Sequence, residues 1–323
     1  EMQKDEVGRQ KITMWTRWLT VPLAMLQSYG MIALLRNYLS QITAFDVVSI
    51  MITTTAGTVF LMWLGELISE KKIGNGVSMI IFAGIVARLP QDILQTFSVY
   101  DPSKLFTIIA FVVLAVVTVV GIVIINEGQR NIPVQHARQI RGNRTFGGTT
   151  THLPLRVNMG GVIPIIFAIS VILFPEMIAQ FFQRAQTPWI AAAATWVLQA
   201  WSNQLVYGIM YFILVFAFTY FYTEVIFHPE RIAENLQKQG AFIPGIRPGQ
   251  HTQEYLANTT YKIIFVGALF LGLIAVLPLI VKAFTQISSL AIGGTSILIV
   301  VAVVIDMVKQ IEAQLTMREY EGM

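Results

Sequence analysis

The residues of this sequence that could hold a metal or carry out acid–base chemistry are few, and they are scattered. The four histidines, His136, His152, His228 and His251, stand far apart, and the chain has no cysteine. The sequence has no histidine cluster, no HExxH pattern and no Walker phosphate loop, the local motifs of metal and phosphate sites. We therefore expect solvated loop histidines, no metal and no cofactor, and a protein that is not an enzyme.

Eight apolar stretches would form the structural framework that positions any functional residues. They cover about residues 18–35, 47–68, 76–92, 105–126, 160–180, 205–227, 262–283 and 293–310. Most approach the ~20 residues that a helix needs to cross a membrane. Hydrophobic residues make up 55% of the chain and charged residues 12%, which excludes an ordinary soluble domain. Because lipid offers no backbone hydrogen bonds, we predict an all-α polytopic protein of eight transmembrane helices, forming one membrane domain over 1–323.

Basic residues concentrate in alternate connections between these stretches. Most of the 22 Lys and Arg residues lie before the first stretch, in the second, fourth and sixth connections, and in the tail. Loops rich in Lys and Arg remain in the cytoplasm. We therefore predict a multi-pass protein whose two termini are both cytoplasmic.

The charged residues of the apolar stretches avoid the middle of the membrane. Asp306 and Lys309, for example, lie in the inner third of the last stretch, where long side chains can reach the surface. Proton- and ion-coupled carriers usually place a charge or a broken helix at mid-membrane. The pattern argues against a secondary transporter of small solutes, which we keep as a weaker alternative.

Three connections have a character of their own. Residues 127–159 hold the extended runs NIPVQHA and THLPLRVN around the turn RGNRTFGG, which predicts a β-hairpin. Residues 228–261 begin as a polar helix and continue as IPGIRPG, whose prolines and glycines predict an angular turn. We interpret both as docking surfaces. Residues 181–204 carry Trp189, Trp196 and Trp201, which favour an interfacial helix, with a poorly ordered loop as the alternative.

Five segments carry a family resemblance: GTVFLMWLGELI, IGNGVSMIIFAGIVA, THLPLRVNMGGVIPIIFA, GAFIPGIRPGQHT and GGTSILIVV. With them the chain resembles the SecY family, the channel subunits of the bacterial protein-conducting translocon. GRQKI, at Gly8 to Ile12, is similar to the family's GRRKI, with Gln10 in place of an Arg. The resemblance implies a clamshell of two inverted halves, with 1–104 as the remainder of the first half (three spans) and 105–323 as the second (five spans). The family's first two helices and its plug helix are expected to be missing from this sequence.

The resemblance also implies a function and partners. The chain would be the channel subunit of the Sec translocon, passing unfolded secretory chains across the bacterial cytoplasmic membrane and releasing membrane segments sideways into the lipid bilayer. The expected partners are the membrane subunits SecE and SecG, the motor ATPase SecA, the ribosome, signal sequences and nascent polypeptides. The channel itself would be passive and driven by the motor or the ribosome. An inactive truncated fragment is the first alternative.

Matching the pore motifs of the family suggests three ring residues: Ile81 in SMIIF, Ile166 in VIPIIF and Ile299 in SILIVV. A constriction of branched alkyl side chains dewets when closed and blocks ions. From the residues alone, each isoleucine could equally face lipid or a packed core.

The resemblance assigns a docking role to Arg247 in GIRPG, and to Arg138, Arg141 and Arg144 on the neighbouring hairpin, where Asn143 replaces one of the family's paired arginines. A guanidinium pairs well with carboxylates and with RNA phosphates, so it suits SecA and the ribosome alike. For the hairpin arginines, inside-positive topology alone is the alternative.

The resemblance further implies a lateral gate lined by the first, fifth and sixth apolar stretches. Gln27 in MLQSYG and Phe174 are its candidate residues. For Gln27, a structural hydrogen bond between helices is an equally good interpretation.

Overall fold

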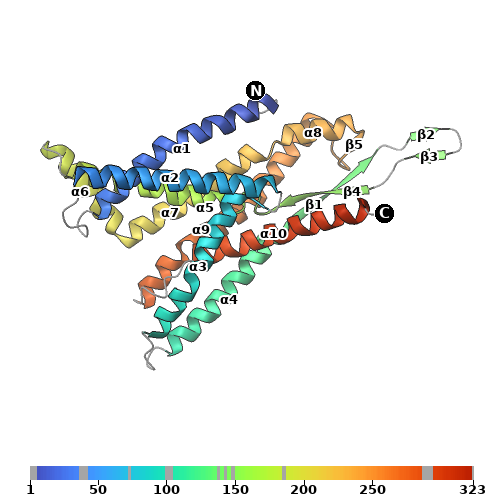
Figure 1. Ribbon diagram of the computed structural model, residues 1–323. Helices are drawn as coiled ribbons and strands as arrows, with labels where there is room; N and C mark the ends of the chain where they lie inside the picture. The colour runs from blue at the N-terminus through green and yellow to red at the C-terminus, as the bar shows by residue number, and fades with distance from the viewer. Residues whose placement is uncertain are drawn as a thin grey trace. The chain divides into compact units, whose positions relative to one another are not determined.

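The protein is mostly helical, as the computed structural model shows (Figure 1). It describes residues 6–35, 43–71, 74–98, 105–136, 139–141, 144–146, 150–183, 187–285 and 294–321. Each of the eight apolar stretches falls in a helix, so their predicted helical character is confirmed. The helices are α1 (Glu6–Leu35), α2 (Ala44–Glu70), α3 (Gly76–Ser98), α4 (Leu105–Glu127), α5 (Ile163–Phe182), α7 (Gln204–Ile226), α9 (Gln250–Thr285) and α10 (Gly294–Glu321).

Within the described residues, four helical segments are long and apolar enough to cross a membrane: Ala44–Glu70, Ile163–Phe182, Gln204–Lys238 and Gln250–Ala283. The segments Gly76–Gln91 and Val112–Glu127 are apolar but shorter. Much of their surface is uncovered, since only 6% of the most apolar part of α2 and 39% of that of α9 is buried. Exposed apolar area on this scale is typical of helices that meet lipid or a partner protein.

The chain divides into two compact units that are interleaved along the sequence. Unit 1 contains Glu1–Ala87, Val171–Tyr207 and Asp306–Met323, and unit 2 contains Arg88–Ser170 and Gly208–Ile305. These units follow contacts within the chain and do not test the expected halves 1–104 and 105–323, which stay a prediction.

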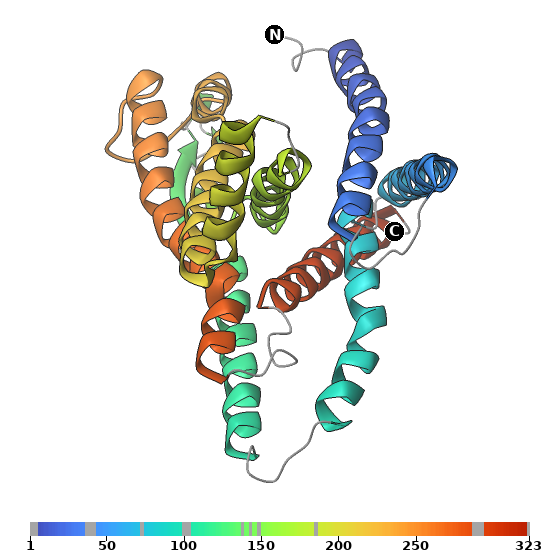
Figure 2. The ribbon, with the colours of Figure 1, turned by 90° about the vertical axis from the view of Figure 1, so that its left-hand side faces the viewer.

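In unit 1, α1 and α2 lie side by side (Figure 2). Their contacts pair the earlier part of α1 with the end of α2, so the two helices run in opposite directions. Near one end Arg17 Nε donates to Glu66 Oε1 at 2.7 Å, and further along the hydroxyls of Ser28 and Thr54 lie 2.6 Å apart. The α2 helix begins with a capping box, in which the side chain of Thr43 accepts from the backbone of Asp46 and the Asp46 carboxylate accepts in return.

The joint between α2 and α3 depends on two glycines. A Cβ atom on Gly76 would clash with the backbone oxygen of Gly65, so only glycine fits there. Ser69 completes the joint: its hydroxyl donates to the Gly65 carbonyl at 2.9 Å and accepts from the Gly76 N–H at 2.9 Å.

In unit 2, the predicted β-hairpin is confirmed. Strand β1 (Gln129–His136) pairs antiparallel with β4 (Thr150–Arg156), from Gln129 opposite Arg156 to Gln135 opposite Thr150. On its other edge β1 pairs with the short β5 (Ala241–Phe242), so the sheet order is β4-β1-β5. Further out, β2 (Gln139–Arg141) pairs with β3 (Arg144–Phe146). The fold is therefore helical with a small sheet, rather than purely α.

The predicted helix in residues 181–204 is confirmed as α6 (Pro188–Ser202). Trp189 and Trp196 stand 72% and 69% exposed, whereas the indole of Trp201 donates to the Ile172 carbonyl of α5 at 3.0 Å. The interfacial location of α6 stays a prediction.

Candidate functional site

The turn that carries Arg247 has a fixed backbone and an exposed tip. It covers residues 243–249, between β5 and α9. The side chain of Ile243 is buried, and its carbonyl accepts a hydrogen bond from the Ile246 N–H at 3.0 Å. Gly245 (φ +82°) and Gly249 (φ +95°) adopt the left-handed conformation that favours glycine. Arg247 itself is exposed between these two bends.

The base of the hairpin has one buried and one polar face. Ile132 and Val134 are 1% and 2% exposed, while the alternate residues Asn131 and Pro133 are exposed. This period of two is what a half-buried strand requires. The polar face also includes Arg156, which is exposed opposite Gln129. The hairpin therefore presents hydrogen-bonding groups on the face away from its core.

The hairpin base and the Arg247 turn share one hydrophobic core, which we call the platform core. It consists of Ile132, Val134, Leu155, Ala241, Ile243 and Leu256, each 0–3% exposed. The helix α8 (Pro229–Lys238) covers this core with the partly buried Ile232 and Leu236. We call the sheet β4-β1-β5, α8, the turn 243–249 and the start of α9 the platform.

The platform holds its two loops together by backbone pairing as well as by packing. Gln135 lies opposite Phe242, and His136 opposite Ala241, in the antiparallel ladder of β1 and β5. The structure thus brings together two segments that the sequence analysis singled out separately as docking surfaces. The hairpin base and the Arg247 turn therefore belong to one packed part of unit 2.

The hairpin tip contains the other predicted docking arginines. The backbones of Arg141 and Arg144 lie opposite each other at the ends of β2 and β3. Arg138 and Asn143 lie outside the described residues. The docking role of Arg138, Arg141 and Arg144 stays a prediction.

The three predicted ring isoleucines lie in α3, α5 and α10. Ile299 is 6% exposed, and Ile81 and Ile166 are partly buried. Ile81 belongs to unit 1, and the other two belong to unit 2. The ring that they would form together stays a prediction.

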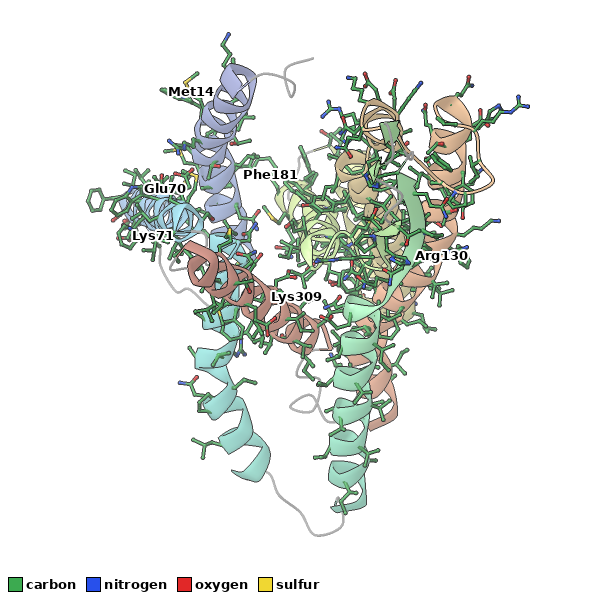
Figure 3. All side chains as sticks on the ribbon, turned by 90° about the vertical axis from the view of Figure 1, so that its right-hand side faces the viewer. Met14, Glu70, Lys71, Arg130, Phe181 and Lys309 are labelled. Atoms are coloured by element: carbon green, nitrogen blue, oxygen red, sulfur yellow. The ribbon has the colours of Figure 1, made fainter. Side chains whose placement is uncertain are left out.

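One of the two predicted gate residues lines an apolar pocket of about 260 Å³ within unit 1. Phe174 of α5 belongs to its wall, and Gln27 of α1 is exposed beside the lining residue Leu26. Phe181, labelled in Figure 3, meets Tyr29 of α1 edge-on at 6.1 Å between ring centroids. The other lining residues are Gly30, Met177, Ile178 and Phe182. The wall offers apolar contact from two helices and almost no polar groups.

Comparison with known proteins places this arrangement in a family. The SecY family matches residues 1–308. The chain belongs to the SecY family. The protein translocase subunit SecY of Halalkalibacterium halodurans is 41% identical over 335 residues, which are 99% of this chain and 76% of the relative. The corresponding subunit of Corynebacterium glutamicum is 41% identical over 348 residues, covering 100% and 77%.

Solved structures agree on the fold of this SecY-family chain. One, described as the structure of a protein-conducting channel, superposes with a TM-score of 0.65 at 16% identity, covering 94% of this chain and 73% of the other. A second, described as a study of the plug domain of SecY, has a TM-score of 0.62 at 16% identity, with coverages of 94% and 74%. The protein is a multi-pass membrane protein of this fold.

Sequence reasoning missed the residues that assemble these sites. The alternation of Ile132 and Val134 with exposed neighbours predicted the hairpin, but not that its buried face packs against the Arg247 turn. The apolar pocket could not have been found this way, because Tyr29 and Phe181 are far apart in the sequence and carry no shared pattern. Among the described residues, no group of three or more His, Cys, Asp or Glu side chains could hold a metal ion.

Proposed function

We propose that this chain is the channel subunit of a Sec translocon, which passes unfolded secretory chains across the bacterial cytoplasmic membrane and releases membrane segments into the bilayer. The observation that carries the proposal is the match to translocase subunits along almost the entire chain, at 41% identity. The channel is passive, and it takes its energy from a partner, the motor ATPase SecA or the ribosome.

The finer architecture belongs to the same proposal. Eight helices cross the membrane, both termini are cytoplasmic, and two inverted halves face each other as a clamshell around Ile81, Ile166 and Ile299. The distribution of Lys and Arg between alternate connections supports this topology. SecE and SecG are the proposed membrane partners.

The platform is the proposed docking surface for SecA and the ribosome. An exposed Arg247 on a fixed turn supports this role, because a guanidinium held in one direction can pair bidentately with a carboxylate or a phosphate. The polar face of the hairpin adds hydrogen-bonding groups from the same platform. The apolar pocket beside Phe174 supports a gate that receives the apolar part of a signal sequence.

Depletion of the protein from its host tests the function as a whole. Secretory precursors with uncleaved signal sequences should accumulate in the cytoplasm within a few generations. If export continues normally and the uptake of a small solute fails instead, the transporter alternative is correct.

The docking role has its own test. In reconstituted vesicles, Arg247→Glu should impair SecA-driven translocation, while the amount of folded channel stays the same because the turn lies outside the candidate spans. Lys71→Glu is the matched control, since Lys71 is an exposed basic residue at the end of α2, outside the platform. Normal translocation by the Arg247 variant would contradict the docking role.

The ring is tested at Ile299. Ile299→Asn should wet the constriction and favour the open channel, so that precursors with defective signal sequences are exported more efficiently. Ile297→Asn, two positions away on the same helix, is the control. Unchanged signal stringency and unchanged ion leak in the Ile299 variant would count against the ring.

A further inference from the structure

We infer that Thr252 is a positioning residue for Arg247: its buried hydroxyl holds the backbone of the turn so that the guanidinium meets the docking partner in one orientation. This inference rests on the proposed docking function of the Arg247 turn. Thr252 itself touches no partner, because its side chain is 2% exposed.

The contact that carries the inference is a single hydrogen bond. Thr252 Oγ1 donates to the backbone carbonyl of Arg247 at 2.9 Å. Thr252 lies in the first turn of α9, which begins at Gln250, so its acceptor lies outside the helix. The bond therefore ties a rigid helix to the exposed residue of the turn.

Two other buried threonines, both in α7, bond differently. Thr219 and Thr223 of α7 each donate to the carbonyl four residues earlier in their own helix, at 2.7 Å. That local bond is the ordinary one for a threonine inside a helix, and it constrains nothing beyond the helix. Thr252 instead donates to a carbonyl five residues earlier, in the loop. The difference indicates that its hydroxyl shapes the turn rather than the helix.

The peptide group that Thr252 holds is the one that orients Arg247. Residue 248 is proline, so this peptide group has no N–H of its own, and the residue before a proline is already restricted to extended conformations. The turn is also closed on both sides: Ile246 N–H donates to the Ile243 carbonyl at 3.0 Å, and Gln253 N–H donates to the Gly249 carbonyl at 3.1 Å. The bond from Thr252 fixes the peptide plane between these two closures.

The test is Thr252→Val, which removes the hydroxyl at nearly constant shape, measured in reconstituted vesicles at saturating ATP and precursor. We expect the apparent KM for the motor ATPase to rise about 5-fold, which corresponds to the loss of one ordinary hydrogen bond. The maximal rate should stay unchanged. Thr252→Ser keeps the hydroxyl and should restore the KM to within about 2-fold of the original. Thr223→Val is the matched control, because it removes an equally buried hydroxyl that bonds locally.

A double variant separates positioning from general stability. If Thr252 acts through Arg247, Thr252→Val should add nothing to the KM once Arg247→Ala has removed the guanidinium. An equal rise in both backgrounds would overturn the inference, and so would a normal KM in Thr252→Val. If Arg247→Ala alone leaves the KM unchanged, the proposed docking function fails instead. All rates are normalised to folded channel, and Thr252→Ala replaces the valine variant if valine lowers that amount.

Discussion

The platform and the α1–α2 pair of unit 1 are stabilised in different ways. The platform buries its own core, with Ile132 and Leu256 at 1% and 0% exposure. By contrast, α1 and α2 leave most of their large apolar side chains exposed, and their described polar links are a hydroxyl pair and one ion pair. Burial of apolar side chains away from water stabilises the platform, whereas the uncovered apolar surface of α1 and α2 gains no such stabilisation within this chain. The chain thus combines a platform that buries its own core with a helix pair whose apolar surface stays uncovered.

The largest expected effect follows from a charge in the platform core. Ile132→Asp would bury an unpaired carboxylate and should destabilise the platform by about 3–5 kcal/mol, while leaving the membrane helices inserted. Limited proteolysis of the protein in vesicles should then cut the hairpin rapidly. Asn131→Asp is the control, because this neighbouring side chain is exposed. Equal cleavage of the two variants would show that the platform does not depend on its core.

A second prediction concerns the joint between α2 and α3. Gly76→Ala places a methyl group against the Gly65 backbone, and we expect a loss of about 2–3 kcal/mol in the free energy of unfolding, read as a lower Tm in detergent. Gly84→Ala in the same helix meets nothing within 4 Å and should be neutral or stabilising. A Gly76 variant as stable as the Gly84 variant would show that the close approach of the two glycines is unimportant.

The sequence predicts the individual helices and the hairpin better than the contacts between distant helices. Long apolar runs predicted the helices, and the alternation around Ile132 predicted the hairpin. Both predictions succeed because these patterns are local in the sequence. The contact of Tyr29 with Phe181 joins helices that are distant in the sequence, and no local pattern encodes it. Phe174 was predicted at the gate by resemblance and lines the pocket, whereas Gln27 lies beside it. The pore ring needs side chains from both units, so it is still a prediction.

A third prediction tests the hydroxyl pair between α1 and α2. Ser28 is 7% exposed, and Ser28→Ala should cost about 0.6–1.7 kcal/mol, since hydrogen bonds between membrane helices are individually modest. Thr53→Ala is the control: Thr53 is exposed and donates to the Ser49 carbonyl of its own helix at 2.8 Å. The measurement is the unfolding free energy in mixed micelles. If Ser28→Ala lowered the unfolding free energy by more than Gly76→Ala does, one polar contact would be the main stabilising interaction of α1 and α2. That result would contradict the contrast drawn between this helix pair and the platform.

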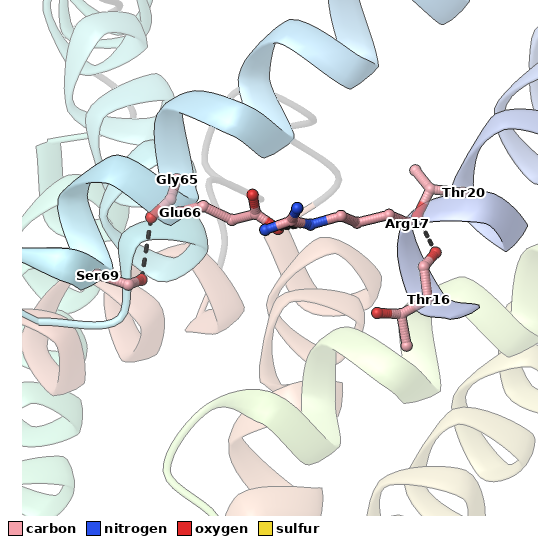
Figure 4. Close-up of polar contacts among 6 residues, drawn as sticks. All are labelled: Thr16, Arg17, Thr20, Gly65, Glu66 and Ser69. Atoms are coloured by element: carbon pink, nitrogen blue, oxygen red, sulfur yellow. Dashed lines mark hydrogen bonds and ion pairs between the residues drawn. The ribbon is translucent and has the colours of Figure 1, made fainter. Parts of the chain in front are cut away.

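The smallest expected effect concerns the ion pair of Arg17 and Glu66 (Figure 4). Their side chains are 53% and 30% exposed, so water and salt screen the attraction despite the short 2.7 Å contact. A double-mutant cycle with Arg17→Gln and Glu66→Gln should give a coupling energy of about 0.2–1 kcal/mol, falling further at 1 M salt. Thr20→Val is a control on the same helix, because Thr20 donates only to the local Thr16 carbonyl at 2.8 Å and should show no coupling to Glu66. A salt-independent coupling well above 1 kcal/mol would mean that the pair is shielded from water in the assembled membrane protein. In that case α1 and α2 would be stabilised by a buried ion pair of their own. The difference in stabilisation between this helix pair and the platform would then be smaller.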